Sequence, residues 1–88
     1  MTVADDIQSA VRSGNAIVGY RETIKFLKSG GPVKEVVMAN NVPKDMDSEM
    51  RRDAEAGEAR LEVFDGTSRD LGTACGKPFP VAAMVIKG

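Results

Sequence analysis

The sequence contains no histidine, no tryptophan and one cysteine, Cys75. Without histidine, the usual serine–histidine and cysteine–histidine nucleophiles are excluded. A zinc site needs several cysteine or histidine ligands, which this chain cannot supply. A single cysteine also excludes an internal disulfide and fits a reducing compartment. We therefore expect a protein that is not an enzyme and uses no cofactor or metal, with Cys75 as a packed core residue.

Long hydrophobic runs are also missing. No apolar run approaches the roughly 20 residues that cross a bilayer. The acidic start around Asp5 and Asp6 has neither the basic nor the apolar region of a signal peptide. A chain of 88 residues with 42% hydrophobic residues can build one core but not two. We expect a single domain over residues 1–88 and no contact with a membrane.

The net charge of −1 hides an uneven distribution of charged residues. Residues 12–34 carry five basic residues and one acidic residue, whereas residues 44–70 carry five basic and nine acidic residues. The total charge argues mildly against a nucleic-acid partner, but the basic stretch leaves one half of the molecule suited to an anion. The acidic helix over residues 45–58 lacks the ligand spacing of a calcium loop, so we expect a solvated outer face.

Helix-like and strand-like patterns alternate along the chain, without a repeat or a linker. Four helices are predicted: residues 2–13, residues 20–29, a stretch from Asp47 or Ser48 to Gly57, and a stretch from Thr67 to about Gly76. Capping boxes open the first helix, with Thr2 and Asp5, and the fourth, with Thr67 and Asp70. The predicted strands are 15–20, 34–39, 60–64 and 81–86, and 34–39 is expected to be buried on both faces. This alternation predicts an α/β fold, a three-layer α/β/α sandwich with a four-stranded mixed sheet.

The stretch "GYRETIKFLKSGG" places three cations, Arg21, Lys25 and Lys28, on one face of a short helix. Gly19 precedes that helix, whose free N–H groups form a natural anion site. The carboxylate of Glu22 could accept hydrogen bonds from guanine donors. Two interpretations remain open from these residues alone: a solvated helix face, or an RNA site that reads the backbone and an exposed base edge together.

The stretch "GTACGKP", residues 72–78, superficially suggests a phosphate-binding loop. Its glycines are one residue too close, and Pro78 stands where the magnesium-binding hydroxyl should be. The segment also precedes a strand, whereas a phosphate loop opens a helix. We reject this interpretation and expect Gly76 to end a helix with a positive φ angle.

Three segments, "GYRETIKFLKSGG", "VVMANNVP" and "FDGTSRDLGTACGKPFPVAAMVI", together resemble the "thirty-e" family of archaeal and eukaryotic large-subunit ribosomal proteins. That family belongs to the superfamily that binds kink-turns in RNA. The match spans nearly the whole chain in order. It implies an α/β/α sandwich that binds a sharply bent internal loop with sheared G·A pairs. The implied partners are ribosomal RNA and neighbouring ribosomal proteins in the cytoplasmic ribosome, with the protein a monomer when free.

In this superfamily the RNA surface joins three loops, which correspond here to residues 19–25, 39–42 and 72–82. Gly19, Glu22 and Lys25 match the superfamily pattern Gly-x-Asn-Glu-x-x-Lys, and Arg21 replaces the asparagine, as a basic residue commonly does in the thirty-e branch. The resemblance implies the following RNA-binding residues: Gly19, Arg21, Glu22, Lys25, Lys28, Asn40, Asn41, Gly72, Lys77, Phe79, Val81 and Ala82.

Lys77 and Phe79 match the basic and apolar pair of the thirty-e branch, and prolines at 78 and 80 flank Phe79. Two alternatives to a ribosomal role remain. One is a kink-turn adaptor of a guide-RNA or RNase P particle, in which asparagine would be expected in place of Arg21. The other, from a different class, is a protein-interaction module that uses the acidic helix as its docking face.

Overall fold

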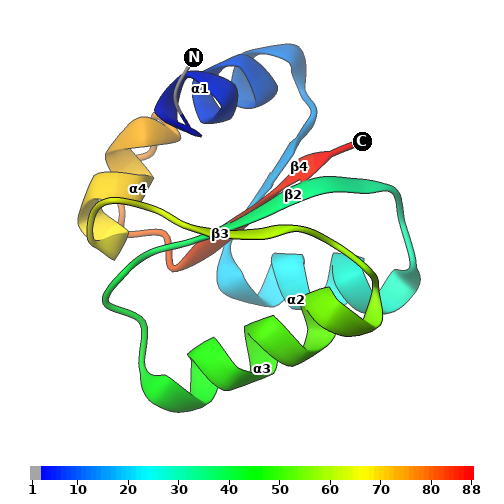
Figure 1. Ribbon diagram of the computed structural model, residues 1–88. Coiled ribbons are helices and arrows are strands. Elements are labelled where there is room, and N and C mark those ends of the chain that lie inside the picture. Colours follow the sequence, from blue (N-terminus) through cyan, green and yellow to red (C-terminus); the bar gives the residue numbers. More distant parts are fainter. Residues whose placement is uncertain (1–2) are drawn as a thin grey trace.

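The computed structural model describes residues 3–88, so the predicted capping residue Thr2 lies outside the described part. Helices and strands alternate as the sequence predicts (Figure 1). The elements are α1 (Val3–Ser13), β1 (Ala16–Val18), α2 (Tyr20–Ser29), β2 (Val33–Met38), α3 (Lys44–Ala56), β3 (Leu61–Val63), α4 (Ser68–Ala74) and β4 (Ala83–Lys87).

The four strands form one mixed sheet in the order β1-β4-β2-β3. The last strand, β4, is antiparallel to both β1 and β2, whereas β2 and β3 run parallel. Met84 of β4 is opposite Val18, the last residue of β1, and Ala83 is opposite Met38, the last residue of β2. The start of β4 therefore lies between the ends of β1 and β2.

Two helices cover each face of this sheet: α1 and α4 on one side, α2 and α3 on the other (Figure 1). Strand β2 supplies both cores, because its successive side chains point to opposite faces. Val37 packs in the core under α1 and α4, and Val36 and Met38 pack in the core under α2 and α3. The predicted three-layer sandwich is confirmed. Burial on both faces holds for residues 36–39, whereas Lys34 is exposed and Glu35 is half-buried at the start of the strand.

Helix ends follow the predicted signals in three places. Gly30 ends α2 in the left-handed conformation, with φ of 76°. Thr67 and Asp70 form a capping box at the start of α4, in which each side chain accepts a hydrogen bond from the other residue's backbone N–H. Gly76 follows α4 with a positive φ of 74°, and Cys75 is 2% exposed in the core, both as expected.

The predicted start of the third helix at Asp47 or Ser48 is wrong, because α3 begins at Lys44. Pro43 precedes it with φ of −58°. The carbonyl of Pro43 accepts a hydrogen bond from the N–H of Asp47 at 2.9 Å, and this bond forms a helical turn ahead of the predicted start. Asp45 and Asp47 lie in this first turn, where the helix dipole favours negative charge. These aspartates support the first turn by charge and do not act as caps.

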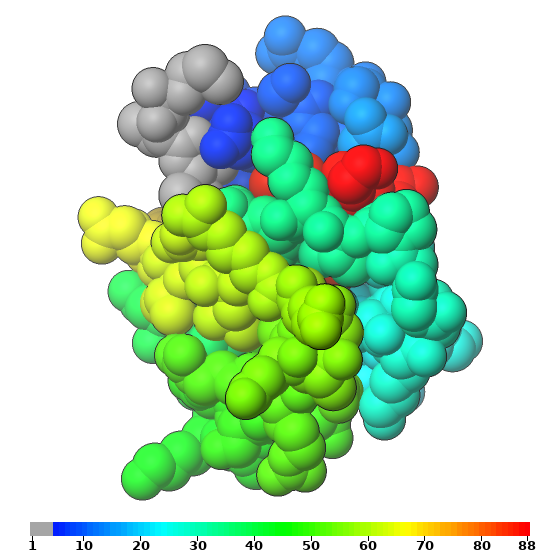
Figure 2. Space-filling view, turned by 45° about the vertical axis from the view of Figure 1, so that its right-hand side comes forward, coloured from blue at the N-terminus to red at the C-terminus, as the bar shows by residue number. Residues whose placement is uncertain are grey.

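The acidic helix α3 faces outward, as predicted. Met50 and Ala54 point into the core at 0% and 1% exposure, and most of its charged side chains are exposed. Figure 2 shows α3 and the segment that leads to β3, in green and yellow-green, as one continuous outer surface below α1. The acidic residues of α3 thus lie on one outer surface of the molecule.

Gly72 allows α4 to approach the loop that precedes β4. A Cβ atom at this position would lie 2.1 Å from the carbonyl oxygen of Phe79, a backbone atom that cannot rotate away. Two backbone hydrogen bonds fix the same contact: Lys77 N–H donates to the Gly72 carbonyl, and Val81 N–H donates to the Ser68 carbonyl, both at 2.9 Å. The loop is therefore held against α4 as one unit.

We expect Gly72→Ala to lower the free energy of unfolding by about 1–3 kcal/mol, because the added methyl group must displace backbone. Gly57→Ala is the matched control: its Cβ would meet only ordinary contacts, with the nearest atom 3.5 Å away, so its stability should stay within about 1 kcal/mol of wild type. Urea unfolding of both variants measures the difference. Equal stabilities of the two variants would contradict the close approach at Gly72.

Candidate nucleic-acid interface

The three loops implied by the sequence meet at one end of the sheet. Gly19, just after β1, donates its N–H to the carbonyl of Ala83 at 2.9 Å. Ala39, just after β2, donates its N–H to the carbonyl of Ala82 at 2.9 Å. Residues 19–25, 39–42 and 72–82 therefore converge on the start of β4, and the structure brings the predicted residues of all three loops together.

The first loop depends on glycine at position 19. Gly19 has φ of 119° and ψ of 148°, a conformation that is essentially restricted to glycine. It forms the N-cap of α2 without a side-chain hydrogen bond, so the first-turn N–H groups receive no capping side chain. The Glu22 carboxylate lies beside it, since a Cβ on Gly19 would come 2.5 Å from Oε2. The first turn of α2 therefore presents its backbone N–H donors next to one acceptor, the Glu22 carboxylate.

The predicted cationic face of α2 is present. Arg21, Lys25 and Lys28 are exposed and border a hollow of about 640 Å³ between α2 and α3. Within residues 3–88 none of the three forms an ion pair, because the two ion pairs found join Arg51 to Asp47 and Arg60 to Glu62. These cations are therefore available to an external anion.

Tyr20 connects this face to the acidic helix. Its hydroxyl donates a hydrogen bond of 2.5 Å to Oε1 of Glu49 on α3. Burial, the hydrogen bond to Glu49 and the charge of that carboxylate raise the pKa of Tyr20 from 10.0 to about 12. Tyr20 thus connects the first turn of α2 to α3, and its hydroxyl is bound to the Glu49 carboxylate that lies beside the cations.

The second loop is held by its asparagines. Asn40 donates its backbone N–H to the Gly66 carbonyl at 2.9 Å. The side-chain Oδ1 of Asn41 accepts the N–H of Ser68 at 2.8 Å, which satisfies a free donor in the first turn of α4. One side-chain acceptor of Asn41 is therefore used inside the protein, and Asn41 positions the second loop against α4.

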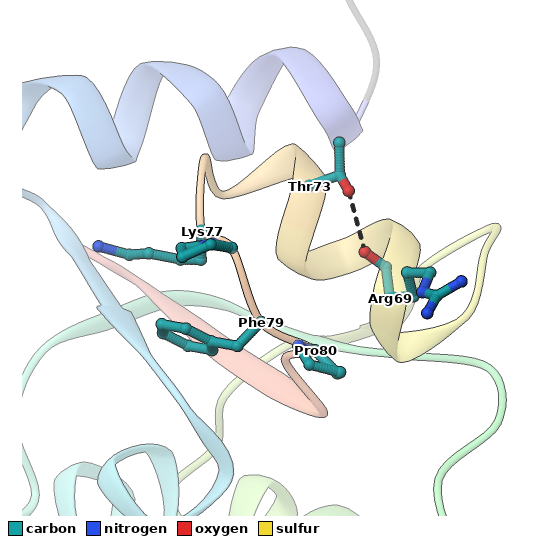
Figure 3. Close-up of a pocket in the computed structure, with 6 residues that line it drawn as sticks. Arg69, Thr73, Lys77, Phe79 and Pro80 are labelled. Carbon is teal, nitrogen blue, oxygen red and sulfur yellow. Dashed lines mark hydrogen bonds between the residues drawn. The ribbon is translucent and has the colours of Figure 1, made fainter.

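The third loop presents an aromatic ring beside a cation. Phe79 is 53% exposed, and Lys77 and Phe79 extend from the same side of the loop in Figure 3. They border a hollow of about 320 Å³ that is also lined by Arg69, Thr73, Pro78 and Pro80. Arg69 and Thr73 were not among the predicted residues. The signal that could have found them is their spacing of four residues on the outer face of α4.

Two predicted RNA-binding residues lie in the interior. Val81 is 2% exposed and packs in the core under α1 and α4, so its side chain cannot contact a ligand. Gly72 is buried as well and serves the close approach described above. Both residues are buried because the third loop folds back onto α4 before β4 begins. Their contribution is to hold Phe79 and Lys77 in place.

Residues 1–88 match the ribosomal protein L7Ae/L30e/S12e/Gadd45 family. The chain belongs to this family. It is 42% identical over 86 residues to large ribosomal subunit protein eL30 of Methanocaldococcus jannaschii, covering 98% of this chain and 77% of that protein. It is 41% identical over 87 residues to large ribosomal subunit protein eL30 of Methanothermobacter thermautotrophicus, covering 99% and 88%. The resemblance found in the sequence is confirmed.

A solved structure shares the fold of this family member. The Giardia lamblia 15.5kD RNA binding protein superposes with a TM-score of 0.86 over 98% of this chain and 71% of that one, at 17% sequence identity. At that identity the likeness concerns the fold alone.

Among residues 3–88, no group of three or more histidine, cysteine, aspartate and glutamate residues is placed to hold a metal ion. No helix of the described residues has the length and apolar character needed to cross a membrane.

The tyrosine at position 20 is the only one in the chain, so its titration can be followed by ultraviolet absorbance. We expect a midpoint near pH 12 in the folded protein, and Glu49→Gln should lower it. Because the pKa of Tyr20 is higher in the folded protein than in the unfolded chain, folding favours the neutral phenol. The stability that Tyr20 contributes is therefore fully present below pH 10 and is lost as the pH rises toward 12. A midpoint near 10 in the folded wild type would contradict both the burial of Tyr20 and its bond to Glu49, and an unchanged midpoint in Glu49→Gln would contradict the bond alone.

Proposed function

We propose that this chain is a non-enzymatic large-subunit ribosomal protein that binds ribosomal RNA at a sharply bent, kink-turn-like internal loop in the cytoplasmic ribosome. The observation that carries the proposal is the convergence of three loops at one end of the sheet, where cations without ion pairs, free helix N–H groups and an exposed aromatic ring lie together. The names of the two archaeal relatives support the ribosomal setting.

Each part of the surface has a distinct role in this proposal. The start of α2 receives a phosphate, because its free N–H groups and the helix dipole favour an anion and Arg21 adds a full positive charge. Glu22 accepts hydrogen bonds from the N1–H and N2–H groups of a guanine at the bend. Lys25 and Lys28 continue along α2 and hold the phosphate backbone of one stem, which fixes the register of the RNA.

The third loop supplies the apolar part of recognition. Phe79 stands between two prolines that restrict its backbone, so little freedom is lost when RNA binds. Its exposed ring stacks on an unpaired nucleotide or sugar at the bend, and Lys77 pairs with the adjacent phosphate. The acidic outer surface of α3 lies away from the RNA and remains open to neighbouring ribosomal proteins.

Binding to a bent RNA should depend on salt despite the acidic net charge. If four or five cations contact phosphates, log K should fall with log salt at a slope of about −3 to −4. Lys28→Ala should weaken all RNAs similarly and reduce the slope by somewhat less than about one unit. Filter binding to a kink-turn RNA and to a plain duplex, over a range of salt, measures both effects. A flat salt response, or equal affinity for the two RNAs, would overturn the proposal.

Phe79→Ala should reduce RNA affinity by an amount that corresponds to about 1–3 kcal/mol, the usual range for base–aromatic stacking. The melting temperature of the free protein should change little, because the ring is 53% exposed. A core aromatic would instead cost about 3–5 kcal/mol of stability. Thermal melting beside RNA titration separates the cases: a large drop in melting temperature with unchanged affinity of the folded fraction would remove Phe79 from the site.

A further inference from the structure

A second basic strip runs along the seam between α1 and α4, on the face of the sheet opposite α2. The hollow beside Phe79 is bordered by Arg69 and Lys77 and includes Thr73 of α4. A second hollow of about 290 Å³ shares Thr73 and continues past Gly76 to Arg12 at the end of α1. The two hollows thus adjoin at Thr73, between the third loop and α1.

The cations of this strip have no acidic partner within residues 3–88. Arg12, Arg69 and Lys77 are exposed, and none of them takes part in the two ion pairs of the described chain. Asp70, the one acidic residue of α4, is engaged in the capping box with Thr67. Burial, and then the charges of Glu62 and Asp6, raise the pKa of Glu35 on β2.

The backbone that carries Lys77 and Arg69 is held by hydrogen bonds. Lys77 is held to α4 by its N–H bond to Gly72, and Arg69 and Thr73 stand one turn apart on that helix, joined by the bond from the Thr73 hydroxyl to the Arg69 carbonyl at 3.1 Å (Figure 3). Arginine and lysine side chains bind phosphate oxygens without reading the bases, so the cations of this strip suit an RNA backbone.

We propose that Arg69 and Arg12, continuing from Lys77, form a second phosphate-binding strip that holds the other helical arm of the bent RNA. This inference rests on the proposed function. A bent internal loop sends out two arms, and the three loops occupy the end of the sheet between its two helical layers (Figure 1). One arm follows the cations of α2, and the second follows the seam of α1 and α4 on the opposite face.

The test compares the double variant Arg12→Gln/Arg69→Gln with wild type on three RNAs that share the bent loop. One RNA has two long arms, and each of the others has one arm cut to a few base pairs. Arg52→Gln is the matched control, since Arg52 is an exposed arginine of α3 outside the two ion pairs. Thermal melting of each free variant establishes that it is folded.

On the long-armed RNA, the double variant should bind about 5- to 30-fold more weakly and lose about 1.5–2 units of salt slope. Cutting one particular arm should abolish this difference, and cutting the other arm should preserve it. Arg52→Gln should match wild type on all three RNAs.

Two results would overturn the proposed strip. One is a double variant that behaves like Arg52→Gln. The other is a loss of affinity of equal size on all three RNAs, which would place both arginines at the bend itself.

Lys25→Gln distinguishes failure of the strip from failure of the proposed function. If wild type prefers bent RNA and Lys25→Gln weakens it, the loop site stands even when the strip does not. If wild type shows no preference for bent RNA over duplex, the proposed function itself fails.

Discussion

Two backbone hydrogen bonds at the start of β4 hold the candidate site together. The carbonyls of Ala82 and Ala83 accept the N–H groups of Ala39 and Gly19, and so join three segments that are far apart in the sequence. These bonds are possible because β4 lies between β1 and β2 and runs antiparallel to both. Every loop of the proposed RNA surface leaves or enters the sheet at this point. A change of strand order would disperse the surface even if each loop kept its residues.

Charge separation follows from the same architecture. The sandwich places the cations of α2 next to the converging loops, and the acidic residues of α3 and the β3 segment on a different outer surface (Figure 2). A nearly neutral chain can therefore offer a positive surface to a polyanion. Tyr20 joins the two regions at the surface, because its bond to Glu49 connects the first turn of α2 to α3.

The elements and the layers could be predicted because local signals and burial pattern agree. The apolar run of β2, the glycine that ends α2 and the capping box of α4 each act over a few residues and do not depend on the rest of the chain. The start of α3 was missed because Pro43 and Lys44 carry no capping side chain, and the extra turn is closed by a backbone bond to Asp47.

The site was predictable where the family pattern fixes residues, as at Gly19, and less so where a side chain has two uses. Asn41 is on the predicted surface, yet its oxygen holds Ser68 of α4. Val81 falls in the third loop but packs in the core, because the loop must close on α4 before the strand begins. Arg69 belongs to no loop and becomes part of the surface only when α4 and the third loop are packed together.

We propose that bent RNA binds where the three loops converge. A two-dimensional amide NMR titration of the protein with a kink-turn RNA tests it residue by residue. The largest shifts should fall in residues 19–25, 39–42 and 72–82, with α3 and β3 nearly unchanged. Shifts concentrated on α3 and β3, with the three loops unaffected, would contradict it.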